Sequence, residues 1–110
     1  MRLTTVQILA GLLLLPSGPA SAQDPALVQA LARNNGCMPC HGMVHKQVGP
    51  GFAQVAERYR DDPTATGRLA GRIRDGSVGT WGRVIMPRQP QLSEAQAKLL
   101  AQWVLVQPPP

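Results

Sequence analysis

Two cysteines and a histidine lie within five consecutive residues of the chain, Cys37-Met38-Pro39-Cys40-His41. Two thiols separated by two residues project from one short helical turn, so both can reach the two vinyl groups of a single porphyrin and form thioether bonds. His41 follows directly and can present an imidazole nitrogen to the iron from the proximal side. The spacing therefore predicts covalent attachment of one haem c at Cys37 and Cys40, with His41 as an axial ligand of the iron.

Three other chemistries use the same residue types. A thioredoxin-like dithiol requires strand and helix alternation around the motif, and the flanking sequence offers none. A structural zinc site normally takes four protein ligands, and His45 is the only further histidine or cysteine in the chain. A disulfide between Cys37 and Cys40 would leave His41 unexplained. Haem attachment is the interpretation that uses all three residues.

The sixth position of the iron decides the function. Met86, followed by Pro87, is the best candidate ligand, because proline stiffens a loop that must deliver a thioether across the haem face. Met38 and Met43 start on the proximal side, next to the attachment motif, and cannot easily reach the distal face. His45 has the same geometrical problem and is expected to be a solvated loop residue. The alternative role for Met86 is a core methionine that fills a gap.

The N-terminus has the pattern of an export signal. Arg2 supplies a positive charge, residues 6–15 form an apolar run, and Ala20-Ser21-Ala22 is a small-residue cleavage site. The apolar run is too short and too early for a membrane span, although an uncleaved anchor is the alternative. We expect residues 1–22 to be a secretory signal peptide and residues 23–110 to form one domain in the bacterial periplasm.

Charge and composition limit the partners and the size of the core. The 110-residue chain has 11 basic and 6 acidic residues, and removal of residues 1–22 takes away only Arg2, which leaves 10 basic residues and a net charge of +4. No dense basic run occurs, so we expect no nucleic acid partner and favour acidic protein surfaces. A domain of this size builds a small core, which a porphyrin would complete. Its only aromatic residues are Phe52, Tyr59, Trp81 and Trp103.

Helical patterns separated by loops rich in glycine and proline must position these residues. Asp24-Pro25 predicts an N-cap followed by the first helical position, and Gly36 predicts the end of that helix. Leu27, Ala30, Leu31 and Asn34 are predicted to share one face of this first helix.

Three further segments complete the predicted all-α fold of three to four helices. Phe52, Val55, Ala56 and Tyr59 indicate a second helix, and Leu69 and Ile73 indicate a third that ends before Gly76. No strand alternation is present. Residues 107–110, which are rich in proline, predict a disordered tail. The capping box at residues 93–96 begins the last helix, whose predicted apolar face is Leu99, Leu100, Trp103 and Val104.

From the first helix onward, the chain resembles the small monohaem bacterial class I cytochromes c of the cytochrome c-551/c-552 group. The resemblance implies a compact all-α fold in which the first and last helices cross beside a haem ligated by His41 and Met86. It also implies a soluble, monomeric periplasmic electron carrier of the respiratory chain, and no enzyme. The matching motifs are Gly36 to His41, Val48-Gly49-Pro50, Leu69 to Ile73, Gly76-Ser77, Gly79 to Gly82, Met86-Pro87 and Trp103-Val104.

The resemblance further implies roles for three haem contacts. In this family the carbonyl at the position of Pro50 accepts a hydrogen bond from the far nitrogen of the proximal imidazole, which fixes the ring. Side chains matching Arg72 and Trp81 lie at an inner haem propionate. The alternatives are that Arg72 belongs to a solvated basic helix face and that Trp81 is simply packed. The spacing of Arg72 with Leu69 and Ile73 turns it towards the core, where an arginine needs an anion.

In this family electrons pass through an exposed haem edge beneath an apolar lip. Here that lip would comprise Val48, Val84, Ile85 and Pro87, with positive charge at its rim from Arg83 and Arg88. Members commonly carry asparagine three residues after the methionine, and that asparagine hydrogen-bonds the ligating sulfur. This chain has Gln89 there, which leaves its contact with the sulfur open.

Two other functions use the same motif. The chain could be the electron-accepting cytochrome subunit of a periplasmic dehydrogenase, or a ligand-binding haem protein with an open sixth site. A filled sixth position at Met86 favours electron transfer over ligand binding.

Overall fold

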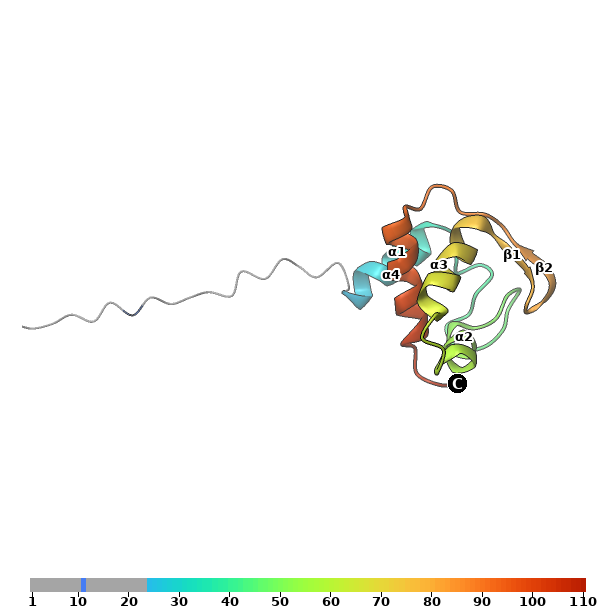
Figure 1. Ribbon diagram of the computed structural model, residues 1–110, viewed down its shortest axis with the longest axis horizontal. Helices are drawn as coiled ribbons and strands as arrows, with labels where there is room; N and C mark the ends of the chain where they lie inside the picture. The colour runs from blue at the N-terminus through green and yellow to red at the C-terminus, as the bar shows by residue number, and fades with distance from the viewer. Residues whose placement is uncertain (1–10, 12–23) are drawn as a thin grey trace, which may run out of the picture.

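The computed structural model describes Gly11 and residues 24–110 (Figure 1). The predicted signal peptide lies outside these residues except for Gly11. Four helices and one hairpin occur between residues 24 and 110. They are, in chain order, α1 (Pro25–Asn34), α2 (Phe52–Tyr59), α3 (Ala65–Asp75), β1 (Ser77–Gly79), β2 (Gly82–Met86) and α4 (Glu94–Leu105). This mostly helical architecture confirms the predicted fold class.

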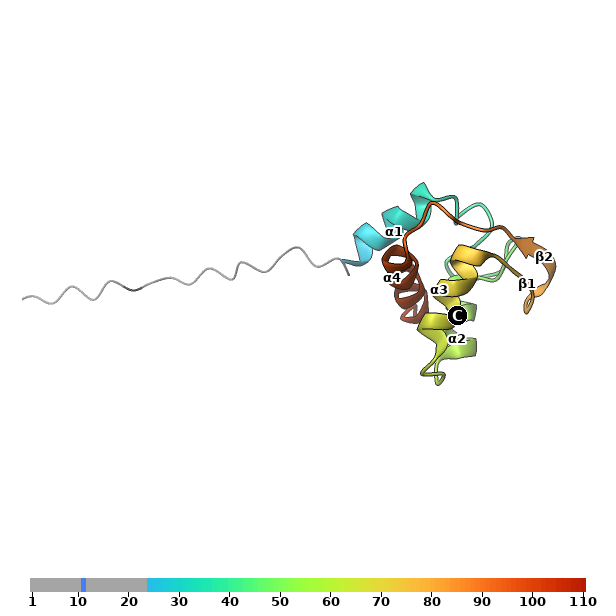
Figure 2. The ribbon, with the colours of Figure 1, turned by 45° about the horizontal axis from the view of Figure 1, so that its top comes forward.

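The last helix, α4, is the centre of the fold, because it contacts each of the other three helices (Figures 1 and 2). Its start is fixed by the predicted capping box: Ser93 Oγ accepts a hydrogen bond from the Gln96 amide at 3.1 Å, and Gln96 Oε1 accepts one from the Ser93 amide at 2.9 Å. Three alanines, Ala70 on α3 and Ala97 and Ala101 on α4, are buried together. Small side chains at this contact let the two helices approach closely.

Helix α1 begins where the sequence predicts, but its buried face differs in part. Asp24 Oδ1 accepts a hydrogen bond from the Ala26 amide at 2.9 Å, and Gly36 adopts a φ of +72° after the helix. The predicted face was only partly right: Leu31 packs against the core, but Leu27 is 57% exposed, and Val28 and Ala32 are the buried residues. The contact with α4 selects the stripe of Val28 and Ala32, and the sequence of α1 alone offers two apolar stripes of similar strength.

The predicted apolar faces of the other helices are confirmed. Phe52, Val55, Ala56 and Tyr59 are all buried in α2. Leu69 and Ile73 of α3 are partly buried and pack against the core. In α4, Leu100, Trp103 and Val104 are buried, and Leu99 packs against them. After α4, residues 108–110 have no regular structure, and the Gln107 side chain donates a hydrogen bond to the Trp103 carbonyl at 2.9 Å.

The β1–β2 hairpin was not predicted. It pairs Ser77 with Met86 and Gly79 with Gly82, and its turn uses the positive φ angles of Gly79 (+94°) and Gly82 (+115°). Both strands are short, and nearly all their residues are exposed, so no alternation of apolar and polar residues marks them in the sequence. The hairpin lies at the edge of the molecule, away from α4 (Figures 1 and 2). Because β2 ends at Met86, the hairpin carries the predicted sixth ligand.

Within residues 24–110, no helix is long and apolar enough to cross a bilayer.

Candidate functional site

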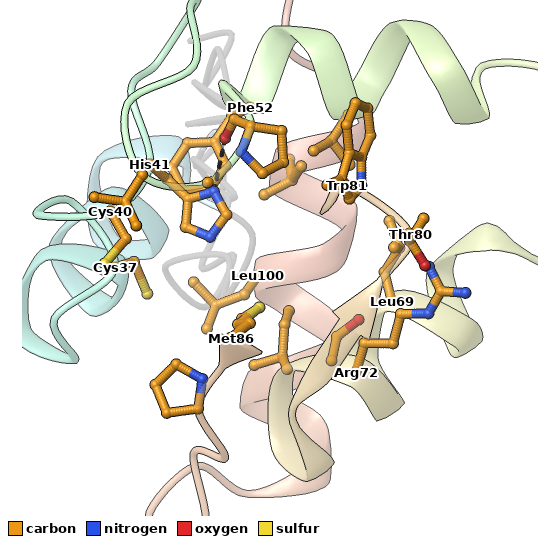
Figure 3. Close-up of a pocket in the computed structure, with 18 of the residues that line it drawn as sticks. Cys37, Cys40, His41, Phe52, Leu69, Arg72, Thr80, Trp81, Met86 and Leu100 are labelled. Atoms are coloured by element: carbon orange, nitrogen blue, oxygen red, sulfur yellow. Dashed lines mark hydrogen bonds between the residues drawn. The ribbon is translucent and has the colours of Figure 1, made fainter. Parts of the chain in front are cut away.

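A cavity of about 1150 Å³, including its open mouth, lies between the helices and the hairpin (Figure 3). Apolar side chains from α2, α3 and α4 form much of its wall. Every site residue predicted from the sequence lines this one cavity: Cys37, Cys40, His41, Pro50, Arg72, Trp81 and Met86.

The attachment motif forms one turn on the cavity wall. The amides of Cys40 and His41 both donate to the Cys37 carbonyl, at 3.2 and 3.0 Å, and the Cys37 amide donates to the Ala32 carbonyl at the end of α1. Both thiols are free and half-buried. Burial raises the pKa of the Cys37 thiol, and the neighbouring Cys40 raises it further. The turn therefore presents two free thiols from the same wall, as thioether formation with one porphyrin requires.

The alternatives to haem attachment find less support in this geometry. Among residues 24–110, no three His, Cys, Asp or Glu side chains gather in a way that could hold a metal ion, so a zinc site lacks its ligand set. His45 is exposed on the loop after the motif.

The imidazole of His41 is fixed from two directions. Its Nδ1 lies 2.7 Å from the Pro50 carbonyl oxygen, and because a carbonyl only accepts, Nδ1 carries the proton. The ring stacks on Phe52 at 5.0 Å between centroids, and Phe52 in turn packs edge-on against Trp103 at 5.2 Å. The other ring nitrogen, Nε2, keeps its lone pair and points into the cavity (Figure 3). His41 is thus held with Nε2 facing the cavity, and its role as an iron ligand stays a prediction.

Met86 reaches the cavity from the hairpin, across from His41 (Figure 3). Met38 and Met43 do not line the cavity and instead pack against the core. The cavity therefore brings one thioether, that of Met86, to the wall opposite the imidazole. Gln89 does not line the cavity, and its Oε1 accepts a hydrogen bond from the Gln91 side chain at 2.6 Å.

Arg72 and Trp81 line a third side of the cavity, as the sequence predicts, and each contacts a further side chain. Arg72 Nη1 donates to the Tyr59 hydroxyl at 3.0 Å. Trp81 is 38% exposed, so it is less packed than expected, and the Arg58 guanidinium lies 4.7 Å from the centre of its ring. Arg58 also donates to the Thr80 carbonyl, 22 residues away. Tyr59 and Arg58 do not line the cavity but contact residues that do, and sequence reasoning missed both contacts because no local pattern indicates them.

Exposed apolar side chains surround the mouth of the cavity. Val48, Val84 and Ile85 all line the cavity and are 47%, 64% and 70% exposed. Exposed Pro87 lies beside them, and the flanking Arg83 and Arg88 are exposed as well. Apolar groups left in water at the edge of a cavity favour contact with a partner.

These residues fit a covalently attached haem. The donor set consists of two free thiols on one turn, an imidazole lone pair and a thioether on opposite walls. The remaining wall is mainly apolar, as a flat porphyrin requires. Its arginine and tryptophan provide donors for acidic substituents at one side.

Comparisons with known proteins agree with this site. The family model described as cytochrome c matches residues 25–107. Cytochrome c-552 of Hydrogenobacter thermophilus is 47% identical over 77 residues, which cover 70% of this chain and 78% of the relative. Cytochrome c-551 of Pseudomonas aeruginosa is 41% identical over 88 residues, or 80% of this chain and 81% of the relative. The crystal structure of Nitrosomonas europaea cytochrome c552 has a TM-score of 0.69 and 42% identity, covering 72% of this chain and 98% of that chain.

The close approach of Gly49 to His41 provides a test of ring orientation. A Cβ at position 49 would lie 3.1 Å from His41 Cε1, so Gly49→Ala should displace the ring and weaken its bond to the Pro50 carbonyl. That bond makes the imidazole a stronger electron donor, so its loss should disfavour Fe(III) and raise the reduction potential. Voltammetry of the haem-loaded variant measures this. Gly67→Ala is the control, because its Cβ would meet nothing within 4 Å. An unchanged or lower potential in Gly49→Ala would contradict this account of His41.

Proposed function

Because the chain belongs to the cytochrome c family, we propose that it is a periplasmic electron carrier that passes single electrons between respiratory redox partners. Members of this family carry covalently bound haem c, so haem c with its iron is the cofactor of this chain. The haem supplies one-electron chemistry when bound, because its iron alternates between Fe(II) and Fe(III). The observation that supports the proposal best is the convergence of two thiols, an imidazole and a thioether on one cavity.

Residues of the proximal wall are proposed to hold the haem and to orient the histidine ligand. Cys37 and Cys40 would hold the haem through thioether bonds, and His41 would bind the iron through Nε2. The Pro50 carbonyl, 2.7 Å from Nδ1, would keep the imidazole in one tautomer and strengthen it as a donor. Phe52 supports the ring from one face and limits its rotation.

The distal wall decides between a carrier and a protein that binds substrates or gases. Met86 is the side chain available to fill the sixth position, and a filled position leaves no site for an exogenous ligand. A thioether favours Fe(II), and apolar walls disfavour the extra charge of Fe(III), so the potential should be positive. We therefore propose His41/Met86 ligation and no enzymatic activity.

Arg72 and Trp81 are proposed to contact the acidic side of the haem. Arg72 lines the cavity and is held by its hydrogen bond to Tyr59, so its guanidinium is already directed along the wall. A charged donor and an indole N–H at one rim suit a carboxylate group. This assignment keeps the charged edge of the cofactor away from the apolar walls.

The proposed cellular site follows from the N-terminus. Residues 1–22 have the pattern of a cleaved secretory signal, and export places the chain where c-type haem is attached in bacteria. We propose that residues 23–110 act as a monomeric domain in the periplasm. Purification from the native periplasm distinguishes this free carrier from the cytochrome subunit of a dehydrogenase, which would remain in a stable complex.

Partner docking is proposed to use the mouth of the cavity. Val48, Val84, Ile85 and Pro87 form an exposed apolar lip that can exclude water from a contact. Arg83 and Arg88 at its edge would attract an acidic surface and raise the association rate.

Replacement of the sixth ligand tests the ligation. Met86→Ala should keep the haem attached, because Cys37, Cys40 and His41 are unchanged, but it should open the iron to water and carbon monoxide. The potential should fall by on the order of hundreds of millivolts, the scale that axial ligands control. Met43→Ala is the matched control, because Met43 packs against the core and does not line the cavity. No change in potential and no carbon monoxide binding in Met86→Ala would exclude Met86 as the ligand.

Reversal of the rim charges tests the docking surface. Arg83→Glu with Arg88→Glu should slow bimolecular electron transfer with the physiological partner about tenfold or more at low salt, with little change in potential. The difference should shrink at physiological salt, where screening limits the field to about 8 Å. Arg60→Glu with Lys98→Glu changes the charge equally at exposed positions outside the cavity wall and should have a smaller effect. Equal rates for the two double variants in stopped-flow measurements would show that the contact lies elsewhere.

A further inference from the structure

Two of the proposed haem contacts depend on a hairpin that has little support of its own. Trp81 lies in the turn between β1 and β2, and Met86 ends β2. Most of the hairpin is exposed: Val78, Val84 and Ile85 have exposed fractions of 61%, 64% and 70%. Segments with few buried apolar contacts open more readily than the core. Something must therefore hold the hairpin if Trp81 and Met86 are to keep their positions.

Arg58 of α2 makes the contact that ties the turn of the hairpin to the helices. Its Nη1 donates to the Thr80 carbonyl at 3.1 Å, and its guanidinium carbon lies 4.7 Å from the centre of the Trp81 ring. Among the described residues, this is the only side-chain hydrogen bond that joins residues 77–86 to a helix. One guanidinium thus fixes both the backbone of the turn and the indole that the turn carries.

On the helix side, this contact is supported by the neighbouring Tyr59. Arg58 is itself exposed, but its guanidinium lies 5.8 Å from the ring of its neighbour Tyr59, which is 8% exposed. The Tyr59 hydroxyl also accepts the hydrogen bond of Arg72. Arg68, the other arginine near the Tyr59 ring, is engaged by Asp62 at 2.6 Å and is not available to the hairpin. Arg58 is therefore the cation that connects the helical core to the hairpin turn.

We propose that Arg58 is a positioning residue that clamps the β1–β2 turn onto α2 and thereby holds Trp81 and Met86 in the cavity. The part of this proposal that concerns Met86 rests on the proposed His41/Met86 ligation. Arginine suits the role because a planar guanidinium can donate to a carbonyl and stack on an indole at once. A lysine ammonium keeps the charge but is a compact group without a planar face for stacking.

The test uses the haem-loaded protein and three variants: Arg58→Ala, Arg58→Lys and the control Arg60→Ala. Arg60 is exposed at the end of α2 and makes no side-chain hydrogen bond or ion pair among the described residues. Amide hydrogen exchange of residues 77–86 should be about three- to tenfold faster in Arg58→Ala, since exposed cation–π contacts and hydrogen bonds contribute modestly. Arg58→Lys should restore less than half of the protection from exchange that Arg58→Ala loses. Arg60→Ala should exchange at the rate of the parent protein.

A second measurement follows the Met86 thioether. Imidazole binds the oxidised iron only after Met86 leaves, so its limiting rate at saturating concentration reports release of the thioether. This rate should rise in Arg58→Ala by a factor similar to that for hairpin exchange, and it should not rise in Arg60→Ala. A clamp acts locally, so exchange in α1 and α4 should not change.

Several outcomes would overturn the proposal. Unchanged amide hydrogen exchange at residues 77–86 in Arg58→Ala would show that Arg58 does not clamp the hairpin. Equally accelerated exchange in α1 and α4 would show that Arg58 contributes only to the overall stability of the protein. Failure of the ligation is recognised separately: if the parent protein lacks the far-red charge-transfer band of an iron–thioether bond, then Met86 is not the ligand. The exchange measurement still tests the clamp in that case.

Discussion

Apolar side chains from several helices line one shared cavity, and this constraint governs the rest of the structure. Helices α2, α3 and α4 all contribute apolar wall to the cavity, and the attachment turn and the hairpin close its remaining sides. A chain of this size with four aromatic residues has little apolar volume with which to fill such a space. The haem c of the family supplies that volume, and covalent bonds to the chain keep it in place. Folding of this protein and binding of its cofactor are therefore coupled.

The two sides of the cavity are built differently. On the proximal side, His41 is held by the Pro50 carbonyl and by an aromatic stack that leads through Phe52 to Trp103 in α4. This arrangement connects the imidazole to the central helix. On the distal side, Met86 ends a short, exposed hairpin whose turn is joined to α2 through Arg58. With the proposed ligation, the proximal wall would set the electronic character of the iron, and a small number of contacts to the hairpin would control access to it.

Sequence reasoning predicted the parts of the structure that depend on local chemistry. The attachment motif, the caps of α1 and α4 and the apolar face of α2 follow from residue types at short spacing, and each is present. Met86 was chosen as the candidate sixth ligand because proline follows it, and the structure places it on the cavity wall at the end of β2. The buried face of α1 was only partly right, because the choice between Leu27 and Val28 depends on where α4 lies. The hairpin and the Arg58 contact were missed for a related reason: exposed strands show no alternation, and a bond across 22 residues leaves no periodic signal.

The most direct test of this account compares the haem-free and haem-loaded forms of residues 23–110 by far-ultraviolet circular dichroism during thermal unfolding. The account predicts that the haem-loaded chain has a strong helical signal and unfolds cooperatively. The haem-free chain should have little helical signal and no cooperative transition, because the cavity between its helices would be unfilled and the remaining core is small. A haem-free chain with helical content close to that of the loaded form and a cooperative transition would contradict it, since the side chains alone would then suffice to build the fold.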